Sequence, residues 1–265
     1  MAHEIDYKIY GEEMQFVEIE LDPEESVLAE AGAMMYMDQK IKMNTIFGDG
    51  SEAEQGKGLM GKLLGAGKRV ITGEGLFMTV FSNVDAGKAH VAFASPYPGS
   101  IIPVDLPDVN GKLVCQKDAF LCAAKGVSVG IELQKKIGVG FFGGEGFIMQ
   151  KLEGDGKVFL HAGGTVVKRD LQPGETLRLD TGCLVAMTGD VKYDLAFAGD
   201  IKSSFFGGEG LFLATLTGPG TIWMQSLPFS RMANRIYAAA GGSKGETKSA
   251  NSSLGSLSNL SNLFN

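Results

Sequence analysis

Apolar and polar residues alternate along much of the chain, and this period of two is typical of β-strands. Val158, Leu160 and Ala162 would point to one side of such a strand. Phe159 and His161 would point to the other side. The pattern predicts an all-β protein.

Helical periodicity is confined to a segment near the C-terminus. SRMANRIYAAA predicts a short helix over 230–240. The tail 241–265 is rich in Ser and Asn and low in complexity, so we expect disorder there. A helical turn that docks on a partner subunit is the alternative for the tail, because leucine recurs at every third position: Leu254, Leu257, Leu260 and Leu263.

Three segments repeat one pattern around an acidic residue: VITGEGLFM at 70–78, FFGGEGFIM at 141–149 and FFGGEGLFL at 205–213. Each segment continues as an apolar strand, reaches a turn glycine, and returns as another strand. The turn glycines, Gly87, Gly156 and Gly220, follow the three glutamates by 13, 11 and 11 residues. Gly, Asp and Pro around them favour chain reversal, so each copy predicts a β-hairpin.

A second correspondence lies upstream of these segments. PEESVLAEAGAMMYM at 23–37 aligns with PGETLRLDTGCLVAM at 173–187, and DAFLCAAKGVSVGIEL at 118–133 fits more loosely. We therefore expect a domain over 1–229 that consists of three units and shares one core, as a sandwich or prism with threefold pseudo-symmetry. The units would cover about 5–98, 99–165 and 166–229, with an insertion in the first between Met37 and Ile71.

Composition narrows the class of protein. The 265 residues include 38 glycines, which favour many turns, and the formal net charge of −7 gives no reason to expect a nucleic-acid partner. Cys115, Cys122 and Cys183 match no common disulfide or zinc spacing, so we expect reduced, buried thiols. The sequence shows neither a signal peptide nor a stretch of about 18 apolar residues, and a cytoplasmic location is expected.

Two glycine-rich segments resemble phosphate-binding loops. GVGFFG at 138–143 has the spacing of a dinucleotide site, but the repeated copy loses the first two glycines and no helix pattern follows, so we reject a nucleotide site. GKGLMGKLLGAGKRV at 56–70 lacks the phosphate-loop pattern.

The segment 56–70 keeps a local positive charge interleaved with leucines. It would bury its leucines on the sheet and solvate its cations; contact with an anionic membrane surface or an acidic partner is the alternative. The residues that would make this contact are Lys57, Lys62, Lys68 and Arg69.

The repeated glutamates Glu74, Glu145 and Glu209 are the strongest candidates for a site formed by carboxylates. Carboxylates about 4 Å apart would repel by on the order of 4 kcal/mol at an effective dielectric near 20, which argues against convergence of the three. We expect structural corners whose carboxylates accept backbone N–H bonds. His3, His90 and His161 form no metal-ligand spacing, no local signature of a catalytic nucleophile is present, and we assign no catalytic residue, metal or cofactor.

The GEGLF corner after a glycine and lysine segment, the repeated FFGGEG and the early PEESVLAEAGAMMYM resemble the bacterial members of the altered-inheritance-of-mitochondria protein family, in the tryptophan RNA-binding attenuation protein-like superfamily. The resemblance covers residues 1 to about 230. It implies a double-stranded β-helix-like all-β domain and self-association. It also implies inner-membrane organisation for mitochondrial members, and it supplies no catalytic residues.

We therefore expect a non-enzymatic, cytoplasmic, homo-oligomeric β scaffold or adaptor with a protein or membrane partner. A small-ligand binder or cupin-like enzyme is the alternative, since β barrels often host such sites. RNA binding is a third hypothesis, which the net charge does not support.

Overall fold

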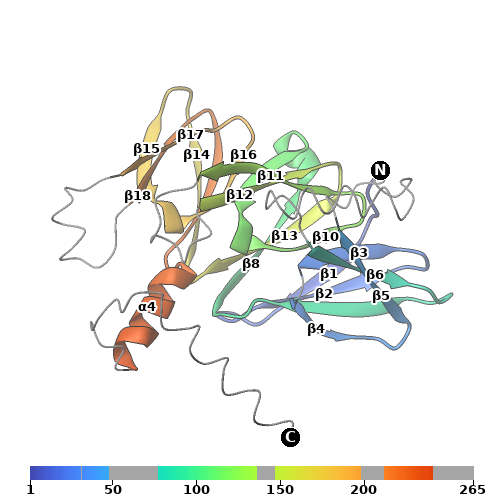
Figure 1. The fold of residues 1–265 in the computed structure, drawn as a ribbon. Helices are drawn as coiled ribbons and strands as arrows, with labels where there is room; N and C mark the ends of the chain where they lie inside the picture. The colour runs from blue at the N-terminus through green and yellow to red at the C-terminus, as the bar shows by residue number, and fades with distance from the viewer. Residues whose placement is uncertain (31, 48–76, 136–146, 198–211, 241–265) are drawn as a thin grey trace, which may run out of the picture. The chain divides into compact units, whose positions relative to one another are not determined.

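Antiparallel β-strands make up most of the computed structural model, which describes residues 1–30, 32–47, 77–135, 147–197 and 212–240 (Figure 1). Within these ranges the α-helical residues form one short helix, α4 (Phe229–Ala239). The predictions of an all-β fold and of a short C-terminal helix are confirmed.

Within the described residues the strands form four sheets, in which neighbouring strands follow the spatial orders below. Sheet 1 contains β1 (Asp6–Tyr10), β2 (Phe16–Leu21), β7 (Ala89–Ala94) and β4 (Met34–Met37). Sheet 2 contains β5 (Ile41–Phe47), β6 (Phe77–Asn83), β3 (Ser26–Glu30), β10 (Phe120–Ala124), β13 (Lys157–Gly163) and β8 (Gly99–Asp105). Sheet 3 contains β11 (Ser128–Lys135), β12 (Phe147–Glu153), β9 (Lys112–Gln116), β16 (Leu184–Thr188), β19 (Gly220–Gln225) and β14 (Val166–Leu171). Sheet 4 contains β15 (Thr176–Asp180), β18 (Phe212–Thr217) and β17 (Lys192–Phe197).

The same strand pairings occur three times along the chain, in the strand sets β2–β7, β8–β13 and β14–β19. In each set the first and third strands pair with the sixth, and the second and fourth pair with the fifth. The third strand of each set also carries a register shift of the β-bulge type at the same point. The shifts lie between Met34 and Tyr36, between Phe120 and Cys122, and between Leu184 and Ala186.

The predicted hairpins at Gly87, Gly156 and Gly220 are wrong. The strands before and after each of these turns belong to different sheets: β6 and β7, β12 and β13, and β18 and β19. Turn residues reverse the chain in the same way whether the next strand stays in its sheet or crosses to the neighbouring one. The sequence signal therefore located the reversals without giving the strand partners.

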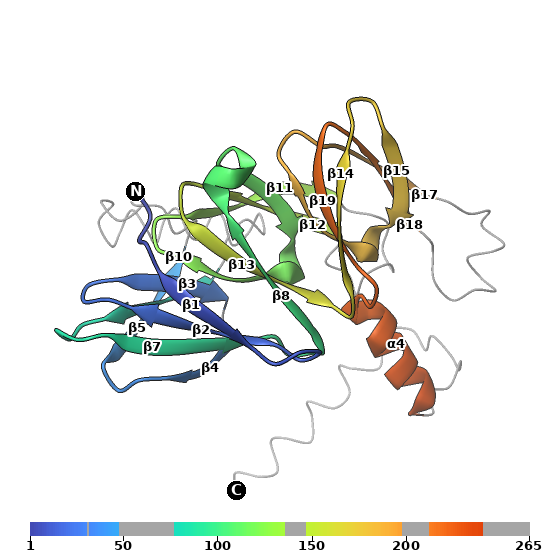
Figure 2. The same cartoon turned by 180° about the vertical axis from the view of Figure 1, so that it is seen from behind.

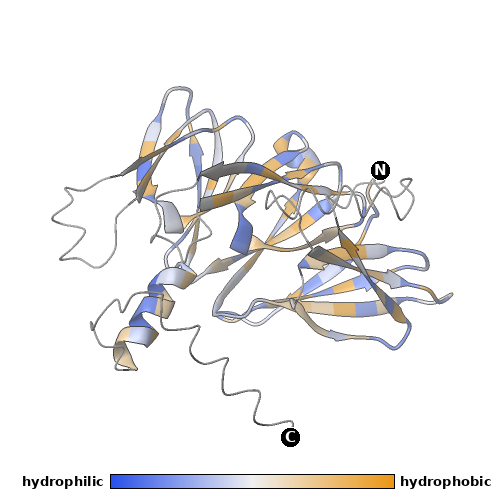
Figure 3. Ribbon diagram, viewed as in Figure 1, coloured by the Kyte–Doolittle hydropathy of each residue, from blue (hydrophilic) through white to orange (hydrophobic). Residues whose placement is uncertain are grey.

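Three hydrophobic clusters fill the spaces between successive sheets, so the prediction of one shared core is also wrong. One cluster joins sheets 1 and 2, with Ile19 and Phe81 among its members; a second joins sheets 2 and 3, and the third joins sheets 3 and 4. Apolar residues recur along the strands of every sheet (Figure 3). Sheets 2 and 3 thus bury both faces, whereas sheets 1 and 4 bury one face each.

Strand β13 shows the consequence of burial on two faces. Val158, Leu160 and Ala162 belong to the cluster between sheets 2 and 3. Phe159 belongs to the cluster between sheets 1 and 2, which confirms the predicted alternation. His161 lies on the same side as Phe159 and is buried.

Residues 1–230 form the first of two compact units. Sheets 1 and 4 lie at opposite ends of the first unit in both ribbon views (Figures 1 and 2). The two end sheets therefore do not pair with each other within one chain.

Candidate functional site

The free edges of sheets 1 and 4 are the candidate site, because the other two sheets are each assembled from two strand sets. In sheet 2, β3 of the first set pairs with β10 of the second. In sheet 3, β9 of the second set pairs with β16 of the third. The strands in equivalent positions at the two ends are β15 and β4, and each is an edge strand of its sheet among the described residues.

The edge strand β4 leaves apolar side chains exposed where the equivalent residues of the other sets are buried. Met35 lies in the bulge and is 55% exposed, whereas the bulge residues Leu121 and Val185 are 4% and 0% exposed. Tyr36 follows Met35 and is 39% exposed, although Cys122, its equivalent in β10, is fully buried. Within the described ranges, the β4 edge therefore lacks a cover that its two equivalents have.

The edge strand β15 shows the same deficit. Leu177 and Leu179 point into the cluster between sheets 3 and 4 but are only partly buried. The equivalent residues of β3 and β9 are 0% exposed: Val27, Ala29, Leu113 and Cys115. Both ends of the β body thus carry a half-covered apolar edge.

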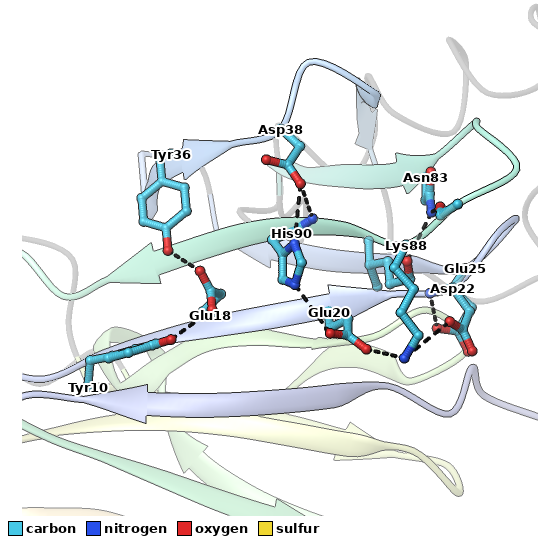
Figure 4. Close-up of polar contacts among 12 residues, drawn as sticks. Tyr10, Glu18, Glu20, Asp22, Glu25, Tyr36, Asp38, Asn83, Lys88 and His90 are labelled. Carbon is cyan, nitrogen blue, oxygen red and sulfur yellow. Dashed lines mark hydrogen bonds and ion pairs between the residues drawn. The ribbon is translucent and has the colours of Figure 1, made fainter.

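A polar network covers the outer face of sheet 1 beside β4 (Figure 4). The Tyr36 hydroxyl donates to Glu18, which also accepts a bond of 3.0 Å from the Tyr10 hydroxyl. The backbone N–H of His90 donates to Asp38 Oδ2 at 2.8 Å. These bonds tie β4 to β2 and β7, so the free edge is held in place.

Ionic contacts continue the network along β2 and β7. Glu20 contacts the Lys88 ammonium and lies 3.2 Å from Nε2 of His90, whose Nδ1 is 3.3 Å from Asp38 Oδ2. The bond from Lys88 is the main cause that lowers the pKa of Glu20. Burial acts to lower the pKa of His90, but the bonds to Asp38 and Glu20 outweigh it and the pKa is raised. The Glu18 carboxylate first, and burial second, raise the pKa of Tyr36 to about 12, so this hydroxyl remains a donor at neutral pH.

Titratable side chains also gather where the first and second strand sets meet. Glu30 ends β3 and is half-buried, and burial, reinforced by Asp118 and opposed by Lys117, raises its pKa to about 7. Burial is also the main cause that raises the pKa of Tyr97 to about 12. The Tyr97 ring lies edge-on to His161, with 4.5 Å between the ring centroids.

Neutral amides occupy the equivalent positions where the second and third sets meet. Gln116 ends β9 as Glu30 ends β3, and its Nε2 donates to the Thr181 carbonyl at 2.5 Å. Gln225 is equivalent to His161; its Nε2 donates to the Gly182 carbonyl and its Oε1 accepts from Gly163 N–H. The first junction therefore carries acid–base groups in place of a satisfied amide pair.

Replacing Glu30 with glutamine is expected to raise the free energy of unfolding at pH 8 by about 2 kcal/mol. The folded-state pKa of about 7 exceeds the ordinary value of 4.5, so ionisation between these values destabilises the folded state as pH rises. Urea unfolding at pH 8 and pH 4.5 measures the effect, which should vanish at pH 4.5. An unchanged or lower stability at pH 8 would contradict a carboxyl group held against ionisation.

The site residues predicted from the sequence lie outside the described residues. They are Lys57, Lys62, Lys68, Arg69, Glu74, Glu145 and Glu209. The membrane contact and the corner role assigned to them stay predictions.

The predicted burial of the cysteines is confirmed for two of the three. No disulfide joins any of the three, and Cys115 and Cys122 are buried, while Cys183 is partly exposed. Burial raises the pKa of the Cys115 and Cys122 thiols, so both stay protonated near neutral pH.

The described part of the chain offers neither a metal-ligand cluster nor a membrane-spanning helix. These residues contain no group of three or more His, Cys, Asp and Glu that could hold a metal ion. Nor does α4 have the length and apolar character that a membrane-spanning helix needs.

Comparisons with known proteins place the chain in a family. The family model Mitochondrial biogenesis AIM24 matches residues 7–227, and the chain belongs to this family. It is 32% identical over 228 residues to an uncharacterized protein of Streptococcus pyogenes serotype M6, with 84% of this chain and 86% of that protein covered. It is also similar to the crystal structure of a Streptococcus pyogenes protein, with a TM-score of 0.70, 27% identity, and coverage of 89% of this chain and 99% of the other. The resemblance seen in the sequence is confirmed.

Proposed function

We propose that the protein is a non-enzymatic, cytoplasmic scaffold that acts as a homo-oligomer. The observation that carries this proposal is the pair of incomplete sheets. Sheets 2 and 3 each join two strand sets, whereas in the described part of the chain β4 and β15 are edge strands of sheets 1 and 4. Unpaired edges present rows of backbone donors and acceptors that other strands can bind.

Exposed apolar residues at the same edges support association over solvation. Met35 and Tyr36 leave 55% and 39% of their surface exposed on β4. Apolar surface exposed beside an unpaired edge favours burial against a partner. The protein would serve as a framework whose repeated sheets extend through its neighbours, with adaptor contacts made elsewhere on its surface.

The solution mass of the full-length chain tests this proposal. We expect light scattering after gel filtration to give a multiple of the 28.1 kDa chain mass. Because edge pairing buries a limited area, the fraction of oligomer should rise with protein concentration. A constant mass of 28.1 kDa at every concentration would contradict a homo-oligomeric scaffold.

A further inference from the structure

We infer that copies of this chain join head to tail, with β15 of one copy paired antiparallel to β4 of the next. This inference rests on the proposed homo-oligomer and specifies its interface. The joined sheets 4 and 1 would have the strand order β17-β18-β15-β4-β7-β2-β1. Its first six strands reproduce the order in which sheets 2 and 3 combine two strand sets within one chain.

Two strand sets join within one chain at β3 with β10 and at β9 with β16. These two internal joints define the register expected for the third joint, between β15 of one copy and β4 of the next. In each, the three residues that follow the bulge pair with the fourth, third and second residues of the partner strand. Cys122, Ala123 and Ala124 pair with Ala29, Leu28 and Val27 in sheet 2, and Ala186, Met187 and Thr188 pair with Cys115, Val114 and Leu113 in sheet 3. The same rule applied to β4 and β15 pairs Tyr36 with Leu179, Met37 with Arg178, and Asp38 with Leu177.

The faces of the two edges also match. At each internal joint, two residues that pair across the strands belong to the same hydrophobic cluster. Cys122 and Ala29 lie in the cluster between sheets 1 and 2, and Cys115 and Ala186 lie in the cluster between sheets 2 and 3. At the inferred joint, Tyr36 on the outer face of sheet 1 would continue the side of sheet 4 that carries Leu179 and packs on sheet 3. One register therefore covers the exposed parts of both strands.

Strand β14 provides the surface that would receive the bulge of β4. Val167 on β14 is 50% exposed, whereas Val17, its equivalent on β2, is 0% exposed. Val17 packs in the cluster that also buries Leu121, the bulge residue of the next set. By the same relation Met35 of a neighbouring copy would lie over Val167, so the two exposed apolar residues would cover each other.

Charge on the end faces limits the extent of this contact. The outer face of sheet 1 carries Glu18, Glu20 and His90. Ala92 occupies the position that Phe159 and Trp223 occupy in the other two sets. Polar outer faces keep the ends of repeat arrays soluble. The pairing would therefore depend on backbone hydrogen bonds and the apolar edge. Because it joins two different surfaces, it would close into a ring or extend as a filament.

Engineered cysteines test the pairing and its register in the full-length chain. All variants carry Cys183→Ser, and the test variant adds Met37→Cys and Arg178→Cys. Opposed residues of an antiparallel pair have Cα atoms about 4.5–5.5 Å apart, within the range for a disulfide. Mild oxidation should convert this variant into a ladder of dimers and higher multimers on a non-reducing gel.

The matched control combines Met37→Cys with Thr176→Cys, which places the second thiol two residues out of register. Diagonal neighbours lie about 7–8 Å apart, so we expect at least a tenfold weaker ladder from this variant. Circular dichroism of each reduced variant checks that it folds. Phe120→Cys would be unsuitable as a control, because the Phe120 side chain is only 3% exposed.

Each outcome decides one claim. A ladder in the Met37→Cys, Arg178→Cys variant and none in the control supports the pairing. Equal ladders would overturn the register. An oligomeric mass for the parent without a ladder would overturn the head-to-tail pairing and leave the scaffold proposal standing. A monomeric mass would overturn both.

Discussion

Replacing Phe159 with alanine is expected to lower the free energy of unfolding by about 3–5 kcal/mol. Phe159 is fully buried in the cluster between sheets 1 and 2, and its ring packs edge-on against Tyr7 at 4.9 Å between centroids. Removal of the ring loses its burial and leaves a cavity between two sheets that share one cluster. Urea unfolding followed by fluorescence or circular dichroism gives the change.

Val84→Ala is the matched control for Phe159→Ala, because Val84 is 54% exposed. A change within about 0.5 kcal/mol is expected for an exposed position. A loss below about 1 kcal/mol for Phe159→Ala would mean that sheets 1 and 2 do not pack closely across β13, and the layered arrangement would be contradicted.

Acid is expected to destabilise the wild-type protein through His161, and His161→Gln should remove that part of the effect. Burial lowers the pKa of His161 to about 4 from an ordinary value of 6.5, although its contact with the Tyr97 backbone opposes this. Between these values the unfolded state binds more protons than the folded state, so stability falls as pH falls. At pH 4 the contribution lost is about 3 kcal/mol.

The geometry around His161 explains why protonation is costly. The side chain is 2% exposed, and neither ring nitrogen makes a hydrogen bond of good geometry. Glutamine is suitable as the replacement because Gln225 occupies the equivalent position and satisfies both ends of its amide. Urea midpoints of wild type and variant from pH 8 to pH 4 should diverge below pH 6.5.

His90→Gln is the control, because its effect on the pH dependence of stability should have the opposite sign. Its pKa is raised, so His90 contributes stability below pH 6.5 that is lost as pH rises through the folded-state value. The His90 variant should therefore lose stability at low pH relative to wild type. Parallel curves for wild type and His161→Gln across pH 4–8 would contradict a neutral, buried His161.

The sequence pattern predicted the elements better than their partners. Alternation around Phe159 marked a strand, and the glycines at 87, 156 and 220 marked chain reversals. Alternation of apolar and polar residues indicates that side chains occupy two faces of a strand. It does not indicate that both faces of β13 are buried. The reversal at Gly87 connects β6 of sheet 2 to β7 of sheet 1, and the choice between sheets depends on long-range pairing that local turn chemistry does not encode.

The candidate edges were not predicted because an edge is defined by what fails to pair with it. Met35 lies in PEESVLAEAGAMMYM. The alignment of this segment with PGETLRLDTGCLVAM already made Val185 the residue equivalent to Met35. Both residues are apolar, and only the structure shows that one is buried and the other exposed. The acid–base junction had a weak signal in the sequence: Glu30 aligned with Asp180, but the amide at Gln116 became comparable only through strand register.

The proposed self-association through the incomplete sheets would connect the repeated fold to its proposed role. Each internal joint already shows that the edge of one strand set fits that of the next. A second copy supplies the same edge, which requires no new kind of contact. The polar network of Glu18, Tyr36, Asp38 and His90 holds β4 in the sheet while leaving its outer edge available.

Light scattering on wild type, Met35→Asp and Met43→Asp is the most direct measurement of the central claim. Met35 and Met43 are similarly exposed, at 55% and 46%, but only Met35 lies on the β4 edge. We expect an oligomer for wild type and Met43→Asp and a shift toward 28.1 kDa for Met35→Asp. A single mass of 28.1 kDa for all three proteins, or an oligomer that Met35→Asp leaves unchanged, would contradict assembly through this edge.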